Sequence, residues 1–340
     1  MPYAQGHTAM RELPIIKTVE RHFLERKDRN PHATSEFSWL LSGITLATKI
    51  IASHVRRAGL LKILGKTGQI NVQGEEVETL DVLANETLVR CLGYRGNVGL
   101  LVSEEDAEPH VIKDSGESGK YIVLFDPLDG SSNINSNVSI GTIFSILHRP
   151  KAGQHDVMAD VLQPGSRQVA AGYVIYGSST VLAYTAGAGV HLFTLDPAIG
   201  AFVLTQEDVK MPAAAPTYSV NEGYREEFPE GIQRYLDWTK TKAAGDYSLR
   251  YVGSLVADFH RTLIRGGVFL YPPTKKTPEG KLRLLYEANP LAFIAEQAGG
   301  VGTDGRQRIL DKKPKAMHDR TPLIIGSKDE VERVLSFWPQ

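Results

Sequence analysis

The chain has 340 residues and a formal net charge of −1, from 38 basic and 39 acidic side chains. This length exceeds what one hydrophobic core usually covers, so two domains are expected. Hydrophobic residues make up 42% and charged residues 23% of the sequence, which is typical of a soluble globular protein. Binding to nucleic acid through phosphate neutralisation would require a basic excess or stripe, and none is visible.

Cysteine use and the N-terminal sequence set further limits. The single cysteine, Cys91, excludes an internal disulfide framework. Residues 1–17 lack the continuous apolar stretch of a secretion signal, and no run approaches the roughly 18 apolar residues that span a membrane. We therefore expect a cytoplasmic protein that does not enter a membrane.

Helical patterns come first along the chain. In residues 36–58, apolar side chains recur at spacings of three or four, and Gly59 is placed to end the helix. Thr34 and Ser35 are available as N-caps for this helix. A second helical pattern covers residues 80–92.

The pattern then changes to short apolar runs between Gly, Pro and Asp turns. These predict strands at 98–102, 121–125, 140–147, 169–176, 180–185 and 190–195. A near-continuous apolar run such as YIVLF is typical of a sheet that is covered on both faces. In the last third, strand and helix patterns alternate at 217–220, 254–265, 268–271, 290–298, 322–326 and 328–337. Together they predict a layered α/β architecture with two sheets, with the low-complexity segment 211–217 as a connector near a domain boundary.

The sequence FDPLDGSSN carries the strongest chemical signal. Asp126 follows an apolar run and Asp129 comes three residues later, across a Pro-Leu turn. Two carboxylates at the end of a buried strand require compensation, and Mg²⁺ or Mn²⁺ suits carboxylate oxygens. The backbone N–H groups and hydroxyls of Gly130, Ser131 and Ser132 could then hold a phosphate. A solvated Asp-Gly turn is the alternative, which the strand before it and the serines after it disfavour.

Three further acids follow another apolar run, VGLLV. Glu104, Glu105 and Asp106 would be an exposed acidic loop if they stood alone. Because the next strand also ends in carboxylates, we expect both groups at one edge of a sheet. Glu287 lies just before the helix that Pro290 helps to start, where an acid can face inward.

Several cations could neutralise the oxygens of an anionic substrate, although a solvated surface charge is the alternative for each. They are Arg250, Lys275, Lys276, Lys281 and Arg283.

At these residues the sequence resembles the class I fructose-1,6-bisphosphatases, within the wider inositol-monophosphatase-like group of lithium-sensitive phosphatases. DPLDGS is shared by that wider group. Similarity to class I rests on LDVLANE, LVSEED, FDPLDGSSNIN, SIGTIFSI, SVNEGY, RYVGSLVADFHRTL and KLRLLYEANPLA. The match runs in co-linear order from about residue 34 to about residue 335.

The resemblance implies a two-domain α/β/α/β/α sandwich, usually assembled as a homotetramer. Residues 1–204 would carry the metal carboxylates and a regulatory site, and residues 205–340 would bind the sugar phosphate. It also implies hydrolysis of the 1-phosphate of fructose 1,6-bisphosphate, which gives fructose 6-phosphate and inorganic phosphate in gluconeogenesis or other sugar-phosphate metabolism. The reaction would use about two to three Mg²⁺ ions per subunit, with Mn²⁺ or Zn²⁺ as substitutes.

Individual roles follow from the matched motifs. The metal carboxylates would be Glu104, Asp126, Asp129 and Glu287, with the carbonyl of Leu128 as a further ligand. Asp81 and Glu105, with Glu104, would position or deprotonate the attacking water. The resemblance assigns substrate contacts to Asp129, Gly130, Ser131, Ser132, Asn221, Tyr224, Arg250, Tyr251, Tyr271 and Lys281, of which Arg250 would reach into the neighbouring subunit's site.

AMP-inhibited members of this family carry a G-T-G-E-like loop, a Lys-Tyr pair, an arginine after the GTIF strand and a threonine. The matching residues here are Thr34, Glu36, Lys120, Tyr121, Arg149 and Thr180. Both loop glycines are changed, and His148 stands where the arginine aligns. The resemblance therefore implies AMP inhibition that is weakened or absent.

Other functions stay open at this point. An inositol-phosphate phosphatase shares DPLDG but is shorter and typically lacks the NEGY and KLRLLYE blocks. A sedoheptulose-1,7-bisphosphatase, or an enzyme with both activities, fits the sequence as well. A catalytically inactive sugar-phosphate sensor would have lost a metal carboxylate, whereas all four are present here.

Overall fold

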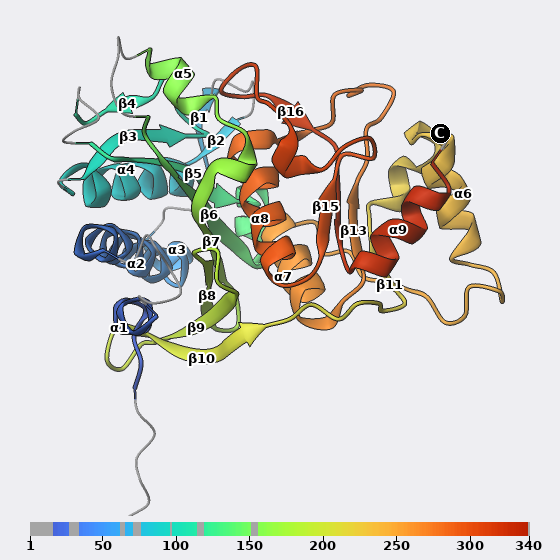
Figure 1. Cartoon of the computed structure of the whole chain (residues 1–340), viewed down its shortest axis with the longest axis horizontal. Helices are drawn as coiled ribbons and strands as arrows, with labels where there is room; N and C mark the ends of the chain where they lie inside the picture. Colours follow the sequence, from blue (N-terminus) through green and yellow to red (C-terminus); the bar gives the residue numbers. More distant parts are fainter. Residues whose placement is uncertain are drawn as a thin grey trace, which may run out of the picture.

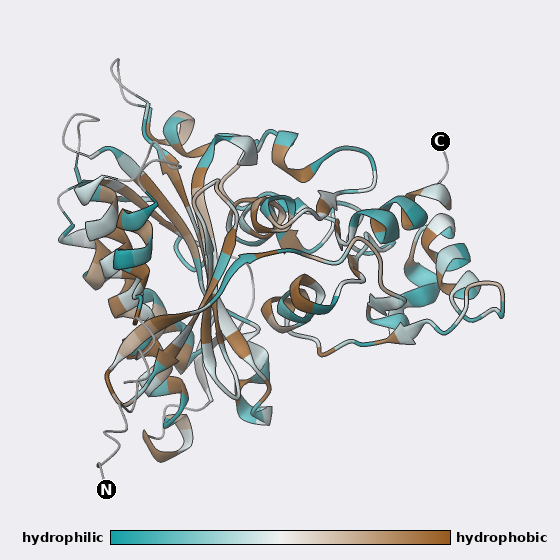
Figure 2. Ribbon diagram, turned by 60° about the horizontal axis from the view of Figure 1, so that its bottom comes forward, coloured by the Kyte–Doolittle hydropathy of each residue, from teal (hydrophilic) through white to brown (hydrophobic). Residues whose placement is uncertain are grey.

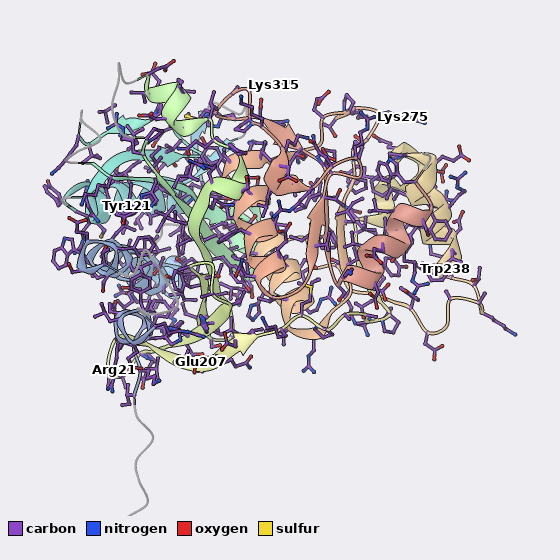
Figure 3. The ribbon with its side chains drawn as sticks, in the orientation of Figure 1. Arg21, Tyr121, Glu207, Trp238, Lys275 and Lys315 are labelled. Carbon is purple, nitrogen blue, oxygen red and sulfur yellow. The ribbon has the colours of Figure 1, made fainter. Side chains whose placement is uncertain are left out.

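The chain folds into five alternating layers of helix and sheet (Figure 1). The computed structural model describes residues 16–338, with the exception of 27–33, 62–64, 71–75, 96, 114–118 and 151–155. Buried hydrophobic side chains fill the spaces between successive layers, as the side-chain view shows (Figure 3). The predicted α/β sandwich is therefore confirmed. No helix in the described part of the chain is long and apolar enough to cross a membrane.

Helices form the first outer layer. They are α1 (Val19–Glu25), α2 (Ser35–Val55), the short α3 (Ala58–Leu61) and α4 (Thr79–Gly93). The expected N-cap of α2 is present, because the hydroxyl of Thr34 accepts a hydrogen bond from the N–H of Phe37 at 3.2 Å. The apolar face of α2, including Leu40, Ile44 and Ile51, is completely buried against the large sheet.

The large sheet has eight strands in the order β10-β9-β8-β7-β6-β5-β3-β4. These are β3 (Val98–Ser103), β4 (His110–Val111), β5 (Tyr121–Asp129), β6 (Ile140–His148), β7 (Gln168–Tyr176), β8 (Thr180–Thr185), β9 (Val190–Asp196) and β10 (Ala201–Val209). Neighbouring strands are antiparallel except for β3 and β5, which are parallel. Every residue of β5 and β7 is buried, as expected for a sheet covered on both faces, and Figure 2 shows the hydrophobic residues along these strands.

The middle layer lies between the two sheets. It contains α7 (Leu255–Arg265), α8 (Asn289–Gln297) and, directly before α8, a π-helical turn at Leu284–Ala288. Its core joins side chains from both sheets and both helices, such as Tyr173, Phe259 and Phe269. Two small antiparallel pairs and one short helix complete the fold: β1 (Lys66–Ile70) with β2 (Glu76–Glu78), β14 (Leu282–Arg283) with β16 (Arg320–Thr321), and α5 (Val157–Val161).

The second sheet and its covering helices form the last two layers. Its order is β12-β11-β13-β17-β15, from β11 (Thr217–Ser219), β12 (Ser248–Leu249), β13 (Val268–Tyr271), β15 (Val301–Thr303) and β17 (Leu323–Gly326). The helices α6 (Glu230–Trp238) and α9 (Lys328–Ser336) cover its outer face.

Several features differ from the sequence-based expectation, and short elements such as β4, β12, β15 and α5 were not predicted. The strand β10 and the helices α1 and α6 were not predicted; β10 is largely exposed and polar, so it lacks the apolar signal of the inner strands. The expected domain boundary after residue 204 falls inside β10, and the chain leaves the large sheet only after Val209. The strand that was expected to end at Asp126 continues to Asp129.

Candidate active site

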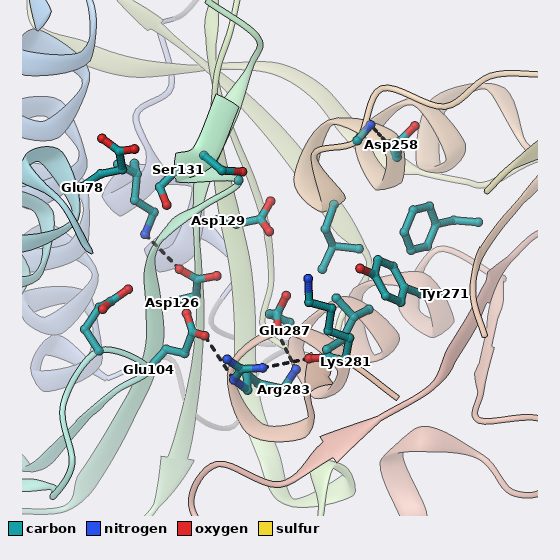
Figure 4. A pocket seen from close by; sticks show the side chains of 18 of the residues that line it. Glu78, Glu104, Asp126, Asp129, Ser131, Asp258, Tyr271, Lys281, Arg283 and Glu287 are labelled. Atoms are coloured by element: carbon teal, nitrogen blue, oxygen red, sulfur yellow. Dashed lines mark hydrogen bonds and ion pairs between the residues drawn. The ribbon is translucent and has the colours of Figure 1, made fainter. Parts of the chain in front are cut away.

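Acidic side chains from two parts of the chain converge where β3 and β5 end (Figure 4). Because these strands are parallel and Ser103 pairs with Phe125, the residues that follow them lie at the same sheet edge. The backbone N–H of Glu104 donates to the carbonyl of Phe125 at 3.1 Å. Carboxylate oxygens of Asp126, Asp129 and Glu287 all lie within 4.8 Å of one another, and all three residues are buried.

A bulge in β5 lets its two aspartates face the same side. The register shifts between Asp126, which pairs with Ile143, and Asp129, which pairs with Gly141. Residues three positions apart point to opposite faces of a regular strand, so the extra residue of a bulge is needed for both carboxylates to face the site. The N–H of Leu128 donates to Asp126 Oδ1 at 2.9 Å, which fixes the aspartate within the bulge.

The next residues turn toward the start of α7. Gly130 has a φ of 76°, which favours glycine, and a Cβ there would lie 2.9 Å from Ser254 Oγ. A 3₁₀ helix follows at Ser131–Ser136. Asp129 Oδ2 accepts the N–H of Val256 at 2.8 Å, so the first turn of α7 holds this carboxylate and favours its charge.

Glu287 enters the site from the second half of the chain. The π-helical turn directs it inward, and its carboxylate accepts the backbone N–H of Arg283. The Arg283 side chain is almost fully buried, with its Nε 3.2 Å from Glu104 Oε1 and its Nη1 donating to the carbonyl of Lys281 at 2.8 Å. One arginine thus partly neutralises the acids and ties both halves of the site together.

The electrostatics of this group favour a bound cation. Burial, with repulsion from Glu104, Asp129 and Glu287, raises the pKa of Asp126 well above its usual value. Burial also raises the pKa of Asp129 to about 7, although the hydrogen bond from Val256 opposes the shift. The raised pKa values show that the ionised carboxylates lack a stabilising positive charge. Their oxygen atoms fit a hard divalent cation such as Mg²⁺, whose charge would favour the ionised form.

Asp81 and Glu105 lie beside this cluster. Asp81 occupies the first turn of α4, where its Oδ2 accepts the N–H of Glu78 at 3.1 Å, and it also hydrogen-bonds to Ser131. Burial and the nearby charge of Glu105 raise the pKa of Asp81 to about 7. Asp81 can therefore exchange a proton near neutral pH, next to a serine that was expected to bind phosphate.

Glu104, Glu105, Asp126, Asp129 and Glu287 line a cavity of about 520 Å³, and Asp81 is not among its lining residues. Its walls also include Leu128, Gly130, Ser131, Ser132 and Arg283. Tyr251, Tyr271 and Lys281 line this cavity and also a neighbouring one of about 260 Å³, which Asn221 and Tyr224 complete. Arg250 lines neither cavity; it is exposed, and its Nη1 donates to the carbonyl of Leu249 at 3.1 Å.

Two acids at the cavity were not predicted as site residues. Glu78 lines the wall next to Asp81, and Asp258 lines the opposite side. Asp258 accepts hydrogen bonds from Ser219 Oγ and from the N–H groups of Val252 and Gly253, so it holds the loop that carries Tyr251. In the sequence, Asp258 differs from its neighbours only as an acidic residue within the helical pattern VADFHRTL, and this is the one feature that could have indicated a site residue.

The residues expected to bind AMP are only partly brought together. Lys120 Nζ lies 2.6 Å from Glu36 Oε2, and the phenol of Tyr121 hydrogen-bonds to Thr34. The ring of His148 stacks on Tyr121, with centroids 5.0 Å apart. These residues gather at the N-terminus of α2.

The other two residues of that set lie elsewhere. Arg149 is buried in an ion pair with Asp160, at 2.8 Å, and does not point to the cluster around Tyr121. Thr180 accepts a hydrogen bond from Arg56, the residue that follows the last turn of α2. A helix of 21 residues is about 30 Å long, so Thr180 lies at the opposite end of α2 from Thr34.

A second group of metal-type ligands joins α1 to β9 and β10: His22, His191 and Glu207. The Nδ1 of His191 accepts the N–H of Asp208 at 3.2 Å, and the guanidinium of Arg26 lies 2.8 Å from its Nε2 and 3.3 Å from Glu207. Because Arg26 already supplies a cation there, we assign no metal to this group.

Comparison with known proteins agrees with this geometry. The family model for the fructose-1-6-bisphosphatase N-terminal domain matches residues 17–207, and that for the C-terminal domain matches residues 211–338. A relative from Chloroherpeton thalassium, named fructose-1,6-bisphosphatase class 1, is 53% identical over 319 residues, which are 93% of this chain and 91% of the relative. A class 1 relative from Salinibacter ruber is 50% identical and covers 96% of this chain and 92% of its own length. The crystal structure of Leishmania major fructose-1,6-bisphosphatase in holo form has a TM-score of 0.90 at 40% identity, covering 95% of this chain and 99% of that one. The chain belongs to the class 1 fructose-1,6-bisphosphatase family.

Proposed function

We propose that this protein hydrolyses the 1-phosphate of fructose 1,6-bisphosphate, giving fructose 6-phosphate and inorganic phosphate, with Mg²⁺ as the required cation. The observation that carries the proposal is the convergence of Asp126, Asp129 and Glu287, buried and within 4.8 Å of one another, in the wall of a cavity. Lys281, Tyr251 and Tyr271 line both this cavity and the neighbouring one, and such groups suit a second phosphate and a sugar.

The metal would be held by Glu104, Asp126, Asp129, Glu287 and the carbonyl of Leu128. When bound, it supplies positive charge to the phosphoryl oxygens and lowers the pKa of a nearby water molecule. About two to three ions per subunit is the count that we propose. The cluster fits this role because its carboxylates are buried and short of positive charge. The guanidinium of Arg283 lies beside Glu104, whereas Glu287 receives the backbone N–H of Arg283.

The chain's own groups would position the reactants and move the proton. Backbone N–H groups and hydroxyls of Gly130, Ser131 and Ser132 would orient the 1-phosphate. The carboxylate of Asp81, with a pKa of about 7, would accept a proton from the attacking water, and Glu105 would assist. The water oxygen bonds to phosphorus and the bond from phosphorus to the sugar oxygen breaks. The sugar oxygen takes a proton from solvent water and leaves as a hydroxyl, and Asp81 returns its proton to solvent, so that the protons balance.

The second half of the chain would bind the rest of the substrate. Lys281 would pair with the 6-phosphate, and the tyrosines that line both cavities would contact the sugar and this phosphate, together with Asn221 and Tyr224. Arg250 is exposed, outside its own subunit's cavity, which supports a role in a neighbouring subunit's site within a homotetramer. The cytoplasmic location stays a prediction.

A phosphate-release assay tests the proposal. The purified protein should release phosphate from fructose 1,6-bisphosphate in Mg²⁺ and lose this activity in EDTA. Sedoheptulose 1,7-bisphosphate and inositol 1-phosphate, in parallel reactions, measure the alternative activities. Higher kcat/KM for either one than for fructose 1,6-bisphosphate would overturn the substrate assignment, and undiminished turnover in EDTA would overturn the metal requirement.

A mixing experiment tests the role of Arg250. Arg250→Ala subunits should assemble normally but show a raised KM for fructose 1,6-bisphosphate. Hybrids of Arg250→Ala with an inactive Asp129→Ala subunit should then recover a low KM at those sites where an intact Arg250 comes from the neighbour. If the KM of a site depends only on the Arg250 of its own subunit, Arg250 does not act in the neighbouring subunit's site.

A further inference from the structure

The metal carboxylates come from two halves of the chain, so their spacing depends on what holds these halves together. Glu104 lies on the loop after β3, and Glu287 lies in the π-helical turn before α8. Mg²⁺ requires near-ideal octahedral geometry, so small displacements of one half against the other would weaken its binding. Contacts that lock these two segments together therefore bear on metal affinity.

Asp106 anchors the first segment. Both of its carboxylate oxygens accept the side-chain amide of Asn85, at 3.0 and 3.1 Å, and Oδ2 lies 2.7 Å from His110 Nε2. Asn85 is one turn after Asp81 on α4. The loop that carries Glu104 and Glu105 is thus tied to the helix that carries Asp81.

His318 links this loop to the second half. Its Nε2 lies 3.1 Å from the backbone carbonyl of Asp106. A carbonyl can only accept, so Nε2 carries the proton. Burial lowers the pKa of His318, which keeps the ring neutral. Its Nδ1 is buried and meets no hydrogen-bond partner among the described residues, so the contact with Asp106 is the polar link that this ring makes within them.

The segment around His318 is firmly joined to the turn that holds Glu287. The ring packs on Tyr286, the residue before Glu287, with centroids 5.5 Å apart and an interplanar angle of 40°. The N–H of Leu284 donates to the carbonyl of Asp319 at 2.8 Å, directly next to the pairing of β14 with β16. Met317 is buried in the same core cluster as Tyr286.

We infer that His318 is a positioning residue, which clamps the Glu104–Asp106 loop onto the Glu287 turn and so sets the spacing of the metal carboxylates from the two halves. It is not among the residues that line the cavity. The inference rests on the proposed metal-dependent function. Loss of a group that orients metal ligands typically weakens metal binding by about 10- to 100-fold, and a change of this size is expected here.

Direct metal binding without substrate tests the clamp. His318→Phe keeps the ring against Tyr286 but removes the donor, whereas His318→Gln places an amide N–H near the position of Nε2. The dissociation constant for Mn²⁺, measured from free Mn²⁺ by electron paramagnetic resonance, should rise about 10-fold or more in His318→Phe and return most of the way to wild type in His318→Gln. Hydrogen exchange at the backbone of residues 104–106 should accelerate in His318→Phe alone.

His260→Phe is the matched control. His260 is a partly buried histidine that contacts the Tyr173 hydroxyl at 2.8 Å, and its substitution should leave the Mn²⁺ dissociation constant unchanged. A His318→Phe protein with wild-type Mn²⁺ affinity would overturn the inference, even if its melting temperature fell, because that result describes a merely structural role. Equal weakening in His318→Phe and His318→Gln would also overturn it.

Activity separates this inference from the proposed function. If the clamp acts on metal binding, saturating Mg²⁺ should restore most of the turnover of His318→Phe, and the Mg²⁺ concentration for half-maximal activity should be raised. A wild-type protein that binds Mn²⁺ but hydrolyses no sugar bisphosphate would refute the proposed function and leave the clamp intact. A fully active wild type, with no shift of metal affinity in His318→Phe, would refute the clamp alone.

Discussion

Replacing Asp81 by asparagine is expected to stabilise the metal-free protein at alkaline pH and to remove most of its turnover. The folded protein raises the pKa of Asp81 from 3.8 to about 7, mainly through burial and the charge of Glu105. At 1.36 kcal/mol for each pH unit, this difference corresponds to roughly 4 kcal/mol of unfavourable free energy when the carboxylate is ionised. Asparagine resembles the protonated acid, because it is neutral and keeps an oxygen for the N–H of Glu78.

The sign of the pH dependence follows from proton binding. Between about pH 4 and pH 7 the folded protein holds more protons on Asp81 than the unfolded chain does, so its stability falls as the pH rises. The Asp81→Asn protein has no carboxylate at this position, so this group no longer lowers its stability as the pH rises. Its advantage over the wild type should therefore widen by about 2–3 kcal/mol from pH 5 to pH 8. The full advantage at pH 8, about 2–4 kcal/mol after some loss of packing, corresponds to a rise of about 3–6 °C in melting temperature for a chain of this length.

Thermal melting in EDTA at both pH values measures the effect. Burial lowers the pKa of His22 and also that of His191, to about 4, so both histidines add an opposite pH dependence. They are present in both proteins and cancel in the difference. Mg²⁺ should narrow the difference, because a nearby cation favours the ionised Asp81 of the wild type. An Asp81→Asn protein no more stable than wild type at pH 8, or a difference that does not change with pH, would refute this reasoning.

Three further substitutions test other parts of the site. Glu104→Ala should lower kcat by about 10²-fold or more, while circular dichroism shows an intact fold, and near-normal turnover would exclude Glu104 from the metal site. Gly141→Ala should reduce the free energy of unfolding in urea by about 1–3 kcal/mol, because its Cβ would lie 2.5 Å from the carbonyl of Val174; unchanged stability would show that β6 can shift without cost. Lys281→Met should raise KM by about 10- to 100-fold with a smaller change in kcat, whereas Lys275→Met, next to the same region, should leave KM unchanged; similar effects of the two would contradict a specific contact to phosphate.

The sequence predicted that the acids converge, because an acidic residue directly after an apolar run indicates a carboxylate next to a buried strand. Asp126 stands directly after five apolar residues, so the sequence predicted a carboxylate next to a buried strand, although the strand itself continues to Asp129. Glu104 follows a similar run, and two such strands side by side bring both carboxylates to one edge. Glu287 gave no such signal by itself, because an acid just before a helix is common on protein surfaces. Its assignment depended on family resemblance, and its place in the site depends on a π-helical turn that no local pattern indicated.

Contacts over long distances in sequence account for what was not predicted. The bulge that turns Asp129 to the same side as Asp126 depends on the pairing of β5 with β6. The local sequence PLD does not indicate this pairing. Thr180 matched a motif, yet the length of α2 separates it from Thr34. Arg149 carries the charge expected of a phosphate contact, but Asp160 neutralises it within the protein. In each case the sequence shows the residue type, but not which distant part of the chain the residue contacts.

The same imbalance of charge explains why the two halves of the site must be clamped. The carboxylates of Asp126, Asp129 and Glu287 repel one another in a buried place. The positive charge of Arg283 reaches this group through Glu104, and Glu287 accepts the backbone N–H of Arg283. Without a divalent ion, two changes would relieve this repulsion: protonation of the acids, whose pKa values are raised, and movement of the loop after β3 away from the turn that carries Glu287. The second change would destroy the geometry that Mg²⁺ needs. The contact between His318 and Asp106 opposes that movement with a neutral group, so it holds the halves together without adding charge to the site. Neutral contacts such as this one keep the acids close together in the metal-free protein, so their mutual repulsion persists. The ion relieves this repulsion when it binds, and the free energy released in that step adds to its affinity.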